Sequence, residues 1–184
     1  VFVRSGGVWT PQQKLMASDG AGDDWFGSSV SVSGDTAVVG AHWDEVGMNF
    51  AQGSAYVFVR SGGVWSQQQK LVASDGAVWD HFGTSVSVSE DTAVVGTAPD
   101  ASSSSQEAAY VFVRSGGIWS EQQKLTATDG AANDNFGFAV ALSGDTALVG
   151  APSKNVGANI AQGSAYVFVR RGTTWSQQQK LAAT

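Results

Sequence analysis

The feature that most constrains this sequence is a repeat that runs through its whole length. A segment centred on a Trp occurs four times, at intervals of about 55 residues. Its Trp residues are Trp9, Trp65, Trp119 and Trp175. A second segment, which begins with Phe-Gly, occurs three times between them, from Phe26, Phe82 and Phe136. Because a repeat unit buries its apolar faces against its neighbours, this unit decides the whole fold.

Each segment has the pattern of a β-hairpin. In residues 56–60 β-branched and aromatic residues alternate, and a Ser-Gly-Gly turn follows. On the return strand, alternation predicts that four residues share one face. These are Trp65, Gln67, Gln69 and Leu71. Residues 82–88 alternate in the same way before a Glu-Asp turn, and no stretch keeps the 3.6-residue apolar period of a helix. The sequence therefore predicts an all-β protein.

Two hairpins per repeat make four short strands, which is the size of one β-propeller blade. A single four-stranded sheet would leave both faces uncovered, so we expect the blades to stack around an axis. We assign residues 1–15 to an outer hairpin and residues 16–71, 72–125 and 126–184 to three blades of a single repeat domain. The Ser-rich strand at residues 28–33 is expected to be innermost, and the repeated Trp residues are expected to pack between blades.

About three and a half blades cannot close a ring, because closed propellers have about four to eight. An open half-ring would expose sheet edges and apolar faces, so we expect two chains to complete a six- or seven-bladed ring as a homodimer. Two chains would supply eight outer and six inner hairpins. Three arrangements stay open: one hairpin takes the other's role at a junction, two hairpins stay outside a six-bladed ring, or an inner hairpin precedes Val1.

Composition and charge exclude several classes of partner. With 42% hydrophobic and 14% charged residues, the 184-residue chain can bury a core and is not a disordered chain. Its net charge of -6, without a cluster of Lys or Arg, argues against binding nucleic acid or anionic lipid. No apolar run approaches the roughly 20 residues that span a membrane. The first four residues repeat residues 57–60, as expected of a processed precursor or a trimmed chain.

Two short motifs point to a known family. The Phe-Gly pairs that open the second segment match the first part of its signature, and Gly150-Ala151-Pro152 matches the second part in full. Residues 40–42 and 96–98 match that second motif incompletely. The units resemble FG-GAP repeats, the blades of the integrin α-subunit propeller and of bacterial and fungal propellers, some of them lectins. The resemblance implies a propeller in a secreted or cell-surface protein, whereas propellers as a class serve adhesion, sugar binding and catalysis alike.

Many repeats of this family carry an acidic loop between the second and third strands that wraps Ca²⁺ in oxygen ligands. The corresponding loops here are residues 42–52, 98–107 and 152–162. None has three acidic residues in alternation, and the third has no carboxylate. We therefore expect plain connecting loops with no metal or other cofactor, and calcium is the alternative.

The loop before each Phe-Gly pair carries an Asp at the same place in every repeat. These residues are Asp24, Asp80 and Asp134. An Asp that recurs in this way is expected to accept hydrogen bonds from nearby backbone amides and so to shape the turn, although it can also contact a ligand.

The residues beside these Asp residues differ from repeat to repeat and mix aromatic rings with Asp, Asn and His. They are Asp23, Trp25, Trp79, His81, Asn133 and Asn135. Together they offer a flat apolar face and planar hydrogen-bonding groups, which is what a neutral sugar needs. His42 and Trp43 in the following loop complete the candidate site. The competing interpretation is that Trp25, Trp43 and Trp79 only cap the edges of the blades.

We predict a non-catalytic, multivalent lectin that binds glycans through loops around the ring. The alternative is a structural or adhesive module that docks a protein partner. A contiguous apolar patch on one rim would favour that module, and separate pockets at each blade junction would favour the lectin. No catalytic constellation is evident, because the adjacent pairs Asp23-Asp24 and Asp44-Glu45 are typical surface acids. His42 and His81 have no Cys or second His at metal-ligand spacing in the sequence.

Overall fold

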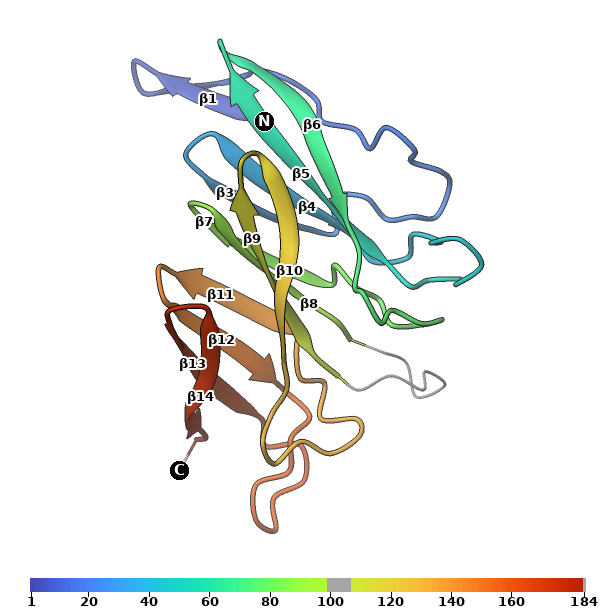
Figure 1. Ribbon diagram of the computed structural model, residues 1–184, viewed down its shortest axis with the longest axis vertical. Helices are drawn as coiled ribbons and strands as arrows, with labels where there is room; N and C mark the ends of the chain where they lie inside the picture. Colours follow the sequence, from blue (N-terminus) through green and yellow to red (C-terminus); the bar gives the residue numbers. More distant parts are fainter. Residues whose placement is uncertain (99–106, 184) are drawn as a thin grey trace.

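The computed structural model describes residues 1–98 and 107–183, and in these residues it contains 14 β-strands and no helix (Figure 1). The first sheet is a hairpin of β1 (Phe2–Ser5) and β2 (Val8–Pro11). The first four-stranded sheet consists of β3 (Ser29–Ser33), β4 (Thr36–Ala41), β5 (Ser54–Ser61) and β6 (Val64–Leu71). The second consists of β7 (Ser85–Ser89), β8 (Thr92–Gly96), β9 (Ala109–Ser115) and β10 (Ile118–Leu125). The third consists of β11 (Ala139–Ser143), β12 (Thr146–Ala151), β13 (Ser164–Arg171) and β14 (Thr174–Leu181). The all-β prediction is confirmed.

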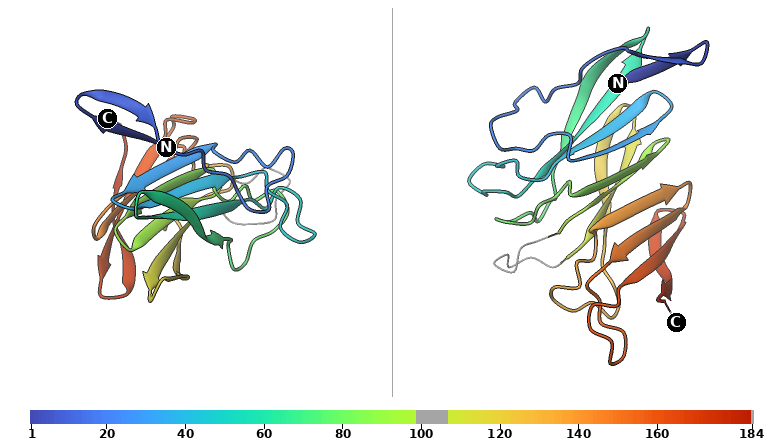
Figure 2. Two further views of the ribbon diagram at one scale, coloured as in Figure 1. Left: turned by 90° about the horizontal axis from the view of Figure 1, so that it is seen from above. Right: turned by 180° about the vertical axis from the view of Figure 1, so that it is seen from behind.

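The three four-stranded sheets have the form of propeller blades, and we name them blades 1, 2 and 3 in chain order. Within each blade the strands lie in chain order and are antiparallel. The first strands of successive blades contact one another, β3 with β7 and β7 with β11, so they form the inner side of the stack as predicted. Figure 2 shows the β1–β2 hairpin at one end of the stack and blade 3 at the other.

Small polar side chains join the inner strands. The Ser29 hydroxyl donates to the Gly83 carbonyl at 2.7 Å, and the Ser31 hydroxyl accepts a hydrogen bond from the Val88 amide at 3.0 Å. At the next pair of inner strands the Ser85 hydroxyl donates to the Gly137 carbonyl, and the Ser87 hydroxyl accepts from the Leu142 amide. The Ser-rich composition of the inner strand therefore serves lateral hydrogen bonding between blades.

The two glycines of the family signature meet at each junction between blades. A Cβ built on Gly40 would lie 2.1 Å from the carbonyl oxygen of Gly83, and one on Gly96 would lie 1.9 Å from that of Gly137. Gly83 also has a φ of +94°, a left-handed conformation that disfavours other residues. The signature thus encodes a close backbone approach between neighbouring blades.

Each repeated Trp was expected to pack between blades, and three of the four do. Trp65, Trp119 and Trp175 are buried in the apolar clusters that join each blade to the unit before it. Within the single chain Trp9 does not pack in this way and is 63% exposed. Trp9 lies on β2, and no sheet precedes the β1–β2 hairpin in the structure.

The outer strands of the blades contain a bulge that the alternation rule does not foresee. In β6 the pairing with β5 skips Gln68, so Gln67 and Gln69 bind successive residues of β5. A bulge shifts the alternation of side chains. Trp65 therefore packs toward the preceding unit and Leu71 packs toward blade 2, so our prediction that they share a face is wrong.

The bulge aims two consecutive Gln side chains at the Trp of the next blade. The Gln68 side chain accepts from the Trp119 indole at 2.9 Å, and the Gln69 amide exchanges two hydrogen bonds with the Trp119 backbone. We call this arrangement the Trp–Gln clasp. It recurs between Gln12-Gln13 and Trp65 and between Gln122-Gln123 and Trp175.

The clasp generates the first prediction. Trp119→Ala is expected to lower the free energy of unfolding by about 3–5 kcal/mol, because it empties a packed site between two blades. The matched control is Ile118→Ala, whose side chain is exposed on the same strand and whose effect should stay within about 0.5 kcal/mol. Urea denaturation followed by circular dichroism measures both. Equal effects would show that the clasp does not hold the blades together.

Candidate functional site

The structure brings six ring side chains together in the loops at the junction of blades 1 and 2. They are Trp25, His42, Trp43, Phe50, Trp79 and His81, and we call them the aromatic cluster. The Trp25 and Trp43 rings stack with centroids 6.2 Å apart. The Trp43 ring meets Trp79 edge-on at 5.8 Å. Figure 1 shows the long loops of these two blades at the same edge of the sheets.

The repeated Asp residues shape the loops that carry the cluster. Each buried carboxylate accepts a hydrogen bond from the backbone amide three residues earlier: Asp24 from Ala21, Asp80 from Ala77, and Asp134 from Ala131. The distances lie between 2.5 and 2.7 Å. The predicted role of these residues in the turn is confirmed.

The residues on either side of each Asp have a left-handed backbone. Trp25, Trp79 and His81 have φ values of 57°, 67° and 52°. A Trp side chain is rare in this conformation, whereas Asn, Asp and His are enriched in it. Blade 3 has Asn133 and Asn135 at these positions. The backbone alone would favour Asn in every blade, so the aromatic residues of blades 1 and 2 have another reason to be there.

The cluster is partly open to solvent and contains polar groups. Trp25 is 60% exposed and Phe50 is also exposed. The His42 Nδ1 lies 2.9 Å from the Ser28 hydroxyl, and its ring lies 5.8 Å from that of His81, centroid to centroid. Partial burial, and to a lesser degree the neighbouring His81, lower the pKa of His42. His42 is therefore neutral at pH 7 and can both donate and accept a hydrogen bond.

The predicted site residues of blade 3 do not join the cluster. The Asn135 amide donates to Ser153 at 2.8 Å, and the Lys154 ammonium donates to Asp134 at 2.8 Å. Ser153 stands where blade 1 has Trp43. The predicted residues therefore form one aromatic site at the first junction and a different, polar arrangement in blade 3.

Phe50 belongs to the cluster, and the sequence analysis missed it. The centroids of the Phe50 and Trp79 rings lie 4.7 Å apart, which is the shortest ring contact among the six described residues of the cluster. The signal was present, because Phe50 and Ile160 occupy the same position in their loops. One copy of a large apolar residue in a loop does not by itself indicate a contact with the loop of the next blade.

The loops that join the second and third strands of blade 1 (residues 42–52) and of blade 3 (residues 152–162) each contribute to an ion pair. The buried Asp44 accepts hydrogen bonds from Ser54 and Tyr56 and pairs with Lys70 at 2.7 Å. Lys70 also pairs with Asp19 and lowers the pKa of that carboxyl. Burial raises the pKa of Tyr56 to about 12, so its hydroxyl remains a donor. The negative charge of Asp44 is therefore already compensated by Lys70 and by two hydroxyl donors.

In blade 3 the position of Asp44 is taken by Lys154, which is buried and pairs with Asp134. An ammonium at this place repels a cation. Residues 99–106 of the second loop lie outside the described residues. No group of three or more His, Cys, Asp or Glu residues that could hold a metal occurs in residues 1–98 and 107–183.

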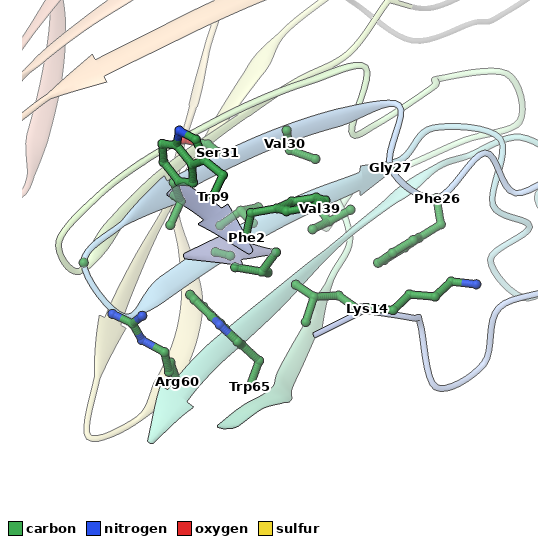
Figure 3. Close-up of a pocket in the computed structure, with 16 residues that line it drawn as sticks. Phe2, Trp9, Lys14, Phe26, Gly27, Val30, Ser31, Val39, Arg60 and Trp65 are labelled. Carbon is green, nitrogen blue, oxygen red and sulfur yellow. The ribbon is translucent and has the colours of Figure 1, made fainter. Parts of the chain in front are cut away.

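A separate cavity of about 780 Å³ lies at the free end of blade 1 (Figure 3). It is lined by Phe2 and Trp9 from the β1–β2 hairpin and by Val30, Val32 and other residues of blade 1. The aromatic cluster takes no part in it. The lining is mostly apolar because these residues belong to the face of a blade that no four-stranded sheet covers.

The fold and its junctions define a propeller-type repeat protein. The sequence matches the family model for the FG-GAP repeat three times, over residues 9–58, 65–112 and 119–168. The chain belongs to the FG-GAP repeat family, as the sequence motifs indicated. No curated protein matches it. No helix that could cross a membrane occurs in the described residues.

The ion pairs of the loops generate a second prediction. Addition of EDTA is expected to leave the melting temperature unchanged within about 1 °C, because Asp44 is paired and Lys154 excludes a cation. Differential scanning calorimetry with EDTA, and again with added Ca²⁺, tests this. A fall of many degrees that Ca²⁺ reverses would show that a loop does bind calcium.

The left-handed backbone generates a third prediction. Trp25→Asn is expected to keep the free energy of unfolding or raise it by about 1 kcal/mol, since Asn relieves backbone strain and the ring is mostly exposed. The control is Trp65→Asn, which should cost about 3–5 kcal/mol because Trp65 is buried between sheets. Strong destabilisation by Trp25→Asn would make the ring part of the scaffold.

Proposed function

We propose that this protein is a non-catalytic lectin and that the aromatic cluster is its sugar-binding site. The observation that carries the proposal is the presence of aromatic rings at backbone positions that favour Asn. Such a choice costs stability, and strained positions of this kind concentrate at functional sites. A secreted or cell-surface location fits this function and is part of the proposal.

The composition of the cluster matches the surface of a sugar. The exposed face of Trp25 offers an apolar platform for the C–H groups of a pyranose ring. The neutral imidazole of His42 and the exposed carboxylate of Asp23 supply hydrogen-bonding groups for hydroxyls near that platform. A sugar bound here would contact loops of two blades, because the partly exposed Trp79 comes from blade 2.

The charge of the chain narrows the class of ligand. The net charge is -6, and Asp23 and Glu45 are exposed in the loops that carry the cluster. Negative charge near a site disfavours an anionic ligand. We therefore propose neutral glycans as the ligands and expect sialylated or sulfated forms of the same glycan to bind less well.

Multivalency would then arise from several copies of the chain. The cluster occurs at the junction of blades 1 and 2, whereas the corresponding positions in blade 3 hold Asn133, Asn135 and Ser153. These polar residues lack an aromatic face. One aromatic site per chain would give an assembly of chains several equivalent sites.

A second candidate function is docking of a protein partner. Met48 at the tip of the first loop is 95% exposed, and Ile160 in the third loop is exposed too. The aromatic cluster is contiguous on one rim, which is the feature we associated with this alternative. Exposed apolar residues around Trp side chains are typical of protein interfaces.

A glycan array followed by titration calorimetry tests the proposed function. The wild-type protein is expected to bind a subset of neutral glycans, and Trp79→Ala should weaken binding of the best of them by about 1–3 kcal/mol. Trp25→Asn should weaken it similarly while the fold remains intact. The control Ile118→Ala changes an exposed apolar side chain outside the cluster and should bind like the wild type.

Two outcomes would contradict the lectin. A wild-type protein that binds no glycan on the array would leave the cluster as a protein-docking surface. Unchanged binding by Trp79→Ala and Trp25→Asn would place the sugar site elsewhere in the chain.

A further inference from the structure

We propose that a second copy of this chain docks end to end on the first, with Trp9 of one copy held by Gln178 and Gln179 of the other. The contact would repeat the Trp–Gln clasp that already joins the units within the chain. This inference concerns the two ends of the blade stack and does not depend on the sugar site.

Each internal junction uses the same two halves. One unit presents two consecutive Gln residues, on its outer strand or just after it, and the outer strand of the next presents a Trp. In all three clasps the indole donates to the first Gln, at 2.9 to 3.1 Å, and the backbone of the Trp bonds the second Gln. The repeat therefore encodes a contact with a defined donor and acceptor on each side.

The described structure leaves one half of this contact at each end of the stack. Trp9 occupies the repeat position of the buried Trp residues but is exposed. Gln178 and Gln179 occupy the position of the clasping pairs and are exposed on β14. A second copy placed head to tail would bring these two halves together.

The apolar surface beside Gln178 and Gln179 is also that of a junction. Leu181 is 43% exposed, whereas its counterparts Leu71 and Leu125 are only 1% exposed against the next blade. Leu148 on β12 is exposed, and its counterpart Val94 is fully buried. Blade 3 thus presents an uncovered apolar face in line with its Gln pair.

The inner strand of blade 3 distinguishes this end from an ordinary junction. Three Ser residues of each preceding inner strand bond the next one; in β11 two of these positions hold Ala139 and Ala141, and the third keeps Ser143. In the structure the β1–β2 hairpin consists of two strands of the outer kind. Blade 3 therefore keeps the outer half of the junction and lacks two of the three inner Ser residues, so this end relies mainly on the outer contacts that the β1–β2 hairpin of a second copy offers.

The opposite end is open enough to receive a copy. Val30 and Val32 are exposed, while their counterparts Val86 and Val88 are buried beneath the inner strand of blade 1. With Phe2 and Trp9 they line the cavity shown in Figure 3. Docking of the apolar face of blade 3 would remove part of this surface from water, which favours association.

Size-exclusion chromatography with light scattering tests the proposal at micromolar concentration. The wild type is expected to have about twice the chain mass of 19.0 kDa, because two head-to-tail contacts can close a ring of two chains. Trp9→Ala alone and the double variant Gln178→Ala/Gln179→Ala should each weaken association at least about tenfold and elute as monomers. Ile118→Ala, an exposed apolar change away from both ends, should elute as the wild type.

The decisive experiment mixes the Trp9→Ala variant with the Gln178→Ala/Gln179→Ala variant. The Trp9→Ala chain still offers its Gln pair, and the double variant still offers Trp9, so an equal mixture can form one intact clasp. The mixture is expected to contain a one-to-one heterodimer that neither variant forms alone. Melting curves by circular dichroism check that both variants remain folded.

Three results would overturn the proposal. They are a monomeric wild type, a Trp9→Ala variant that dimerises as the wild type does, and a mixture of folded variants that stays monomeric. A monomeric wild type that still binds glycans would leave the proposed function intact.

Discussion

The contact on which the rest of this structure depends is the Trp–Gln clasp between consecutive units. A four-stranded sheet has two apolar faces, and neither can be buried within the sheet itself. The clasp fixes how the next sheet approaches, since the indole nitrogen and the peptide groups of each buried Trp bond the Gln pair of the preceding unit. Satisfied polar groups at a buried contact define a single geometry, whereas apolar packing alone would permit sliding. The close approach of Gly40 and Gly83 on the inner side follows from that geometry.

Much of the fold could be predicted from the sequence, because the alternation and turn residues that indicate each hairpin occur in every repeat. Hairpin, blade and inner strand followed from alternation and turn residues. The bulge at Gln68 could not be foreseen, since nothing in a run of three Gln residues shows which one leaves the pairing. For the same reason Trp65 and Leu71 were placed on one face although they point to opposite blades. Trp9 differs from the other three for another reason: its packing needs a neighbouring unit that the sheet order of the single chain does not provide.

The residue types of the candidate site could be predicted from the sequence, but which of these residues lie together in space could not. His42 and His81 stand 39 residues apart and look isolated in the sequence, yet the junction of blades 1 and 2 brings their rings to 5.8 Å. Phe50 reaches Trp79 for the same reason. Blade 3 shows the limit of reasoning from aligned positions. Its loops occupy equivalent places, but Asn135 bonds Ser153 and Lys154 bonds Asp134, so equivalent positions carry different chemistry.

In a repeat protein, residues kept in every copy belong to the scaffold, and residues that differ between copies mark specialised surfaces. The Gln pair and the Asp of each loop are kept in every described unit, because every junction and turn needs them. Aromatic residues replace Asn at the left-handed positions of blades 1 and 2, and Ala replaces Ser in the inner strand of blade 3. Neither change improves the isolated blade: the first strains the backbone, and the second removes hydrogen bonds that the other inner strands make. We therefore attribute these departures to contacts outside the blade: the proposed ligand in the first case and the proposed second copy in the second.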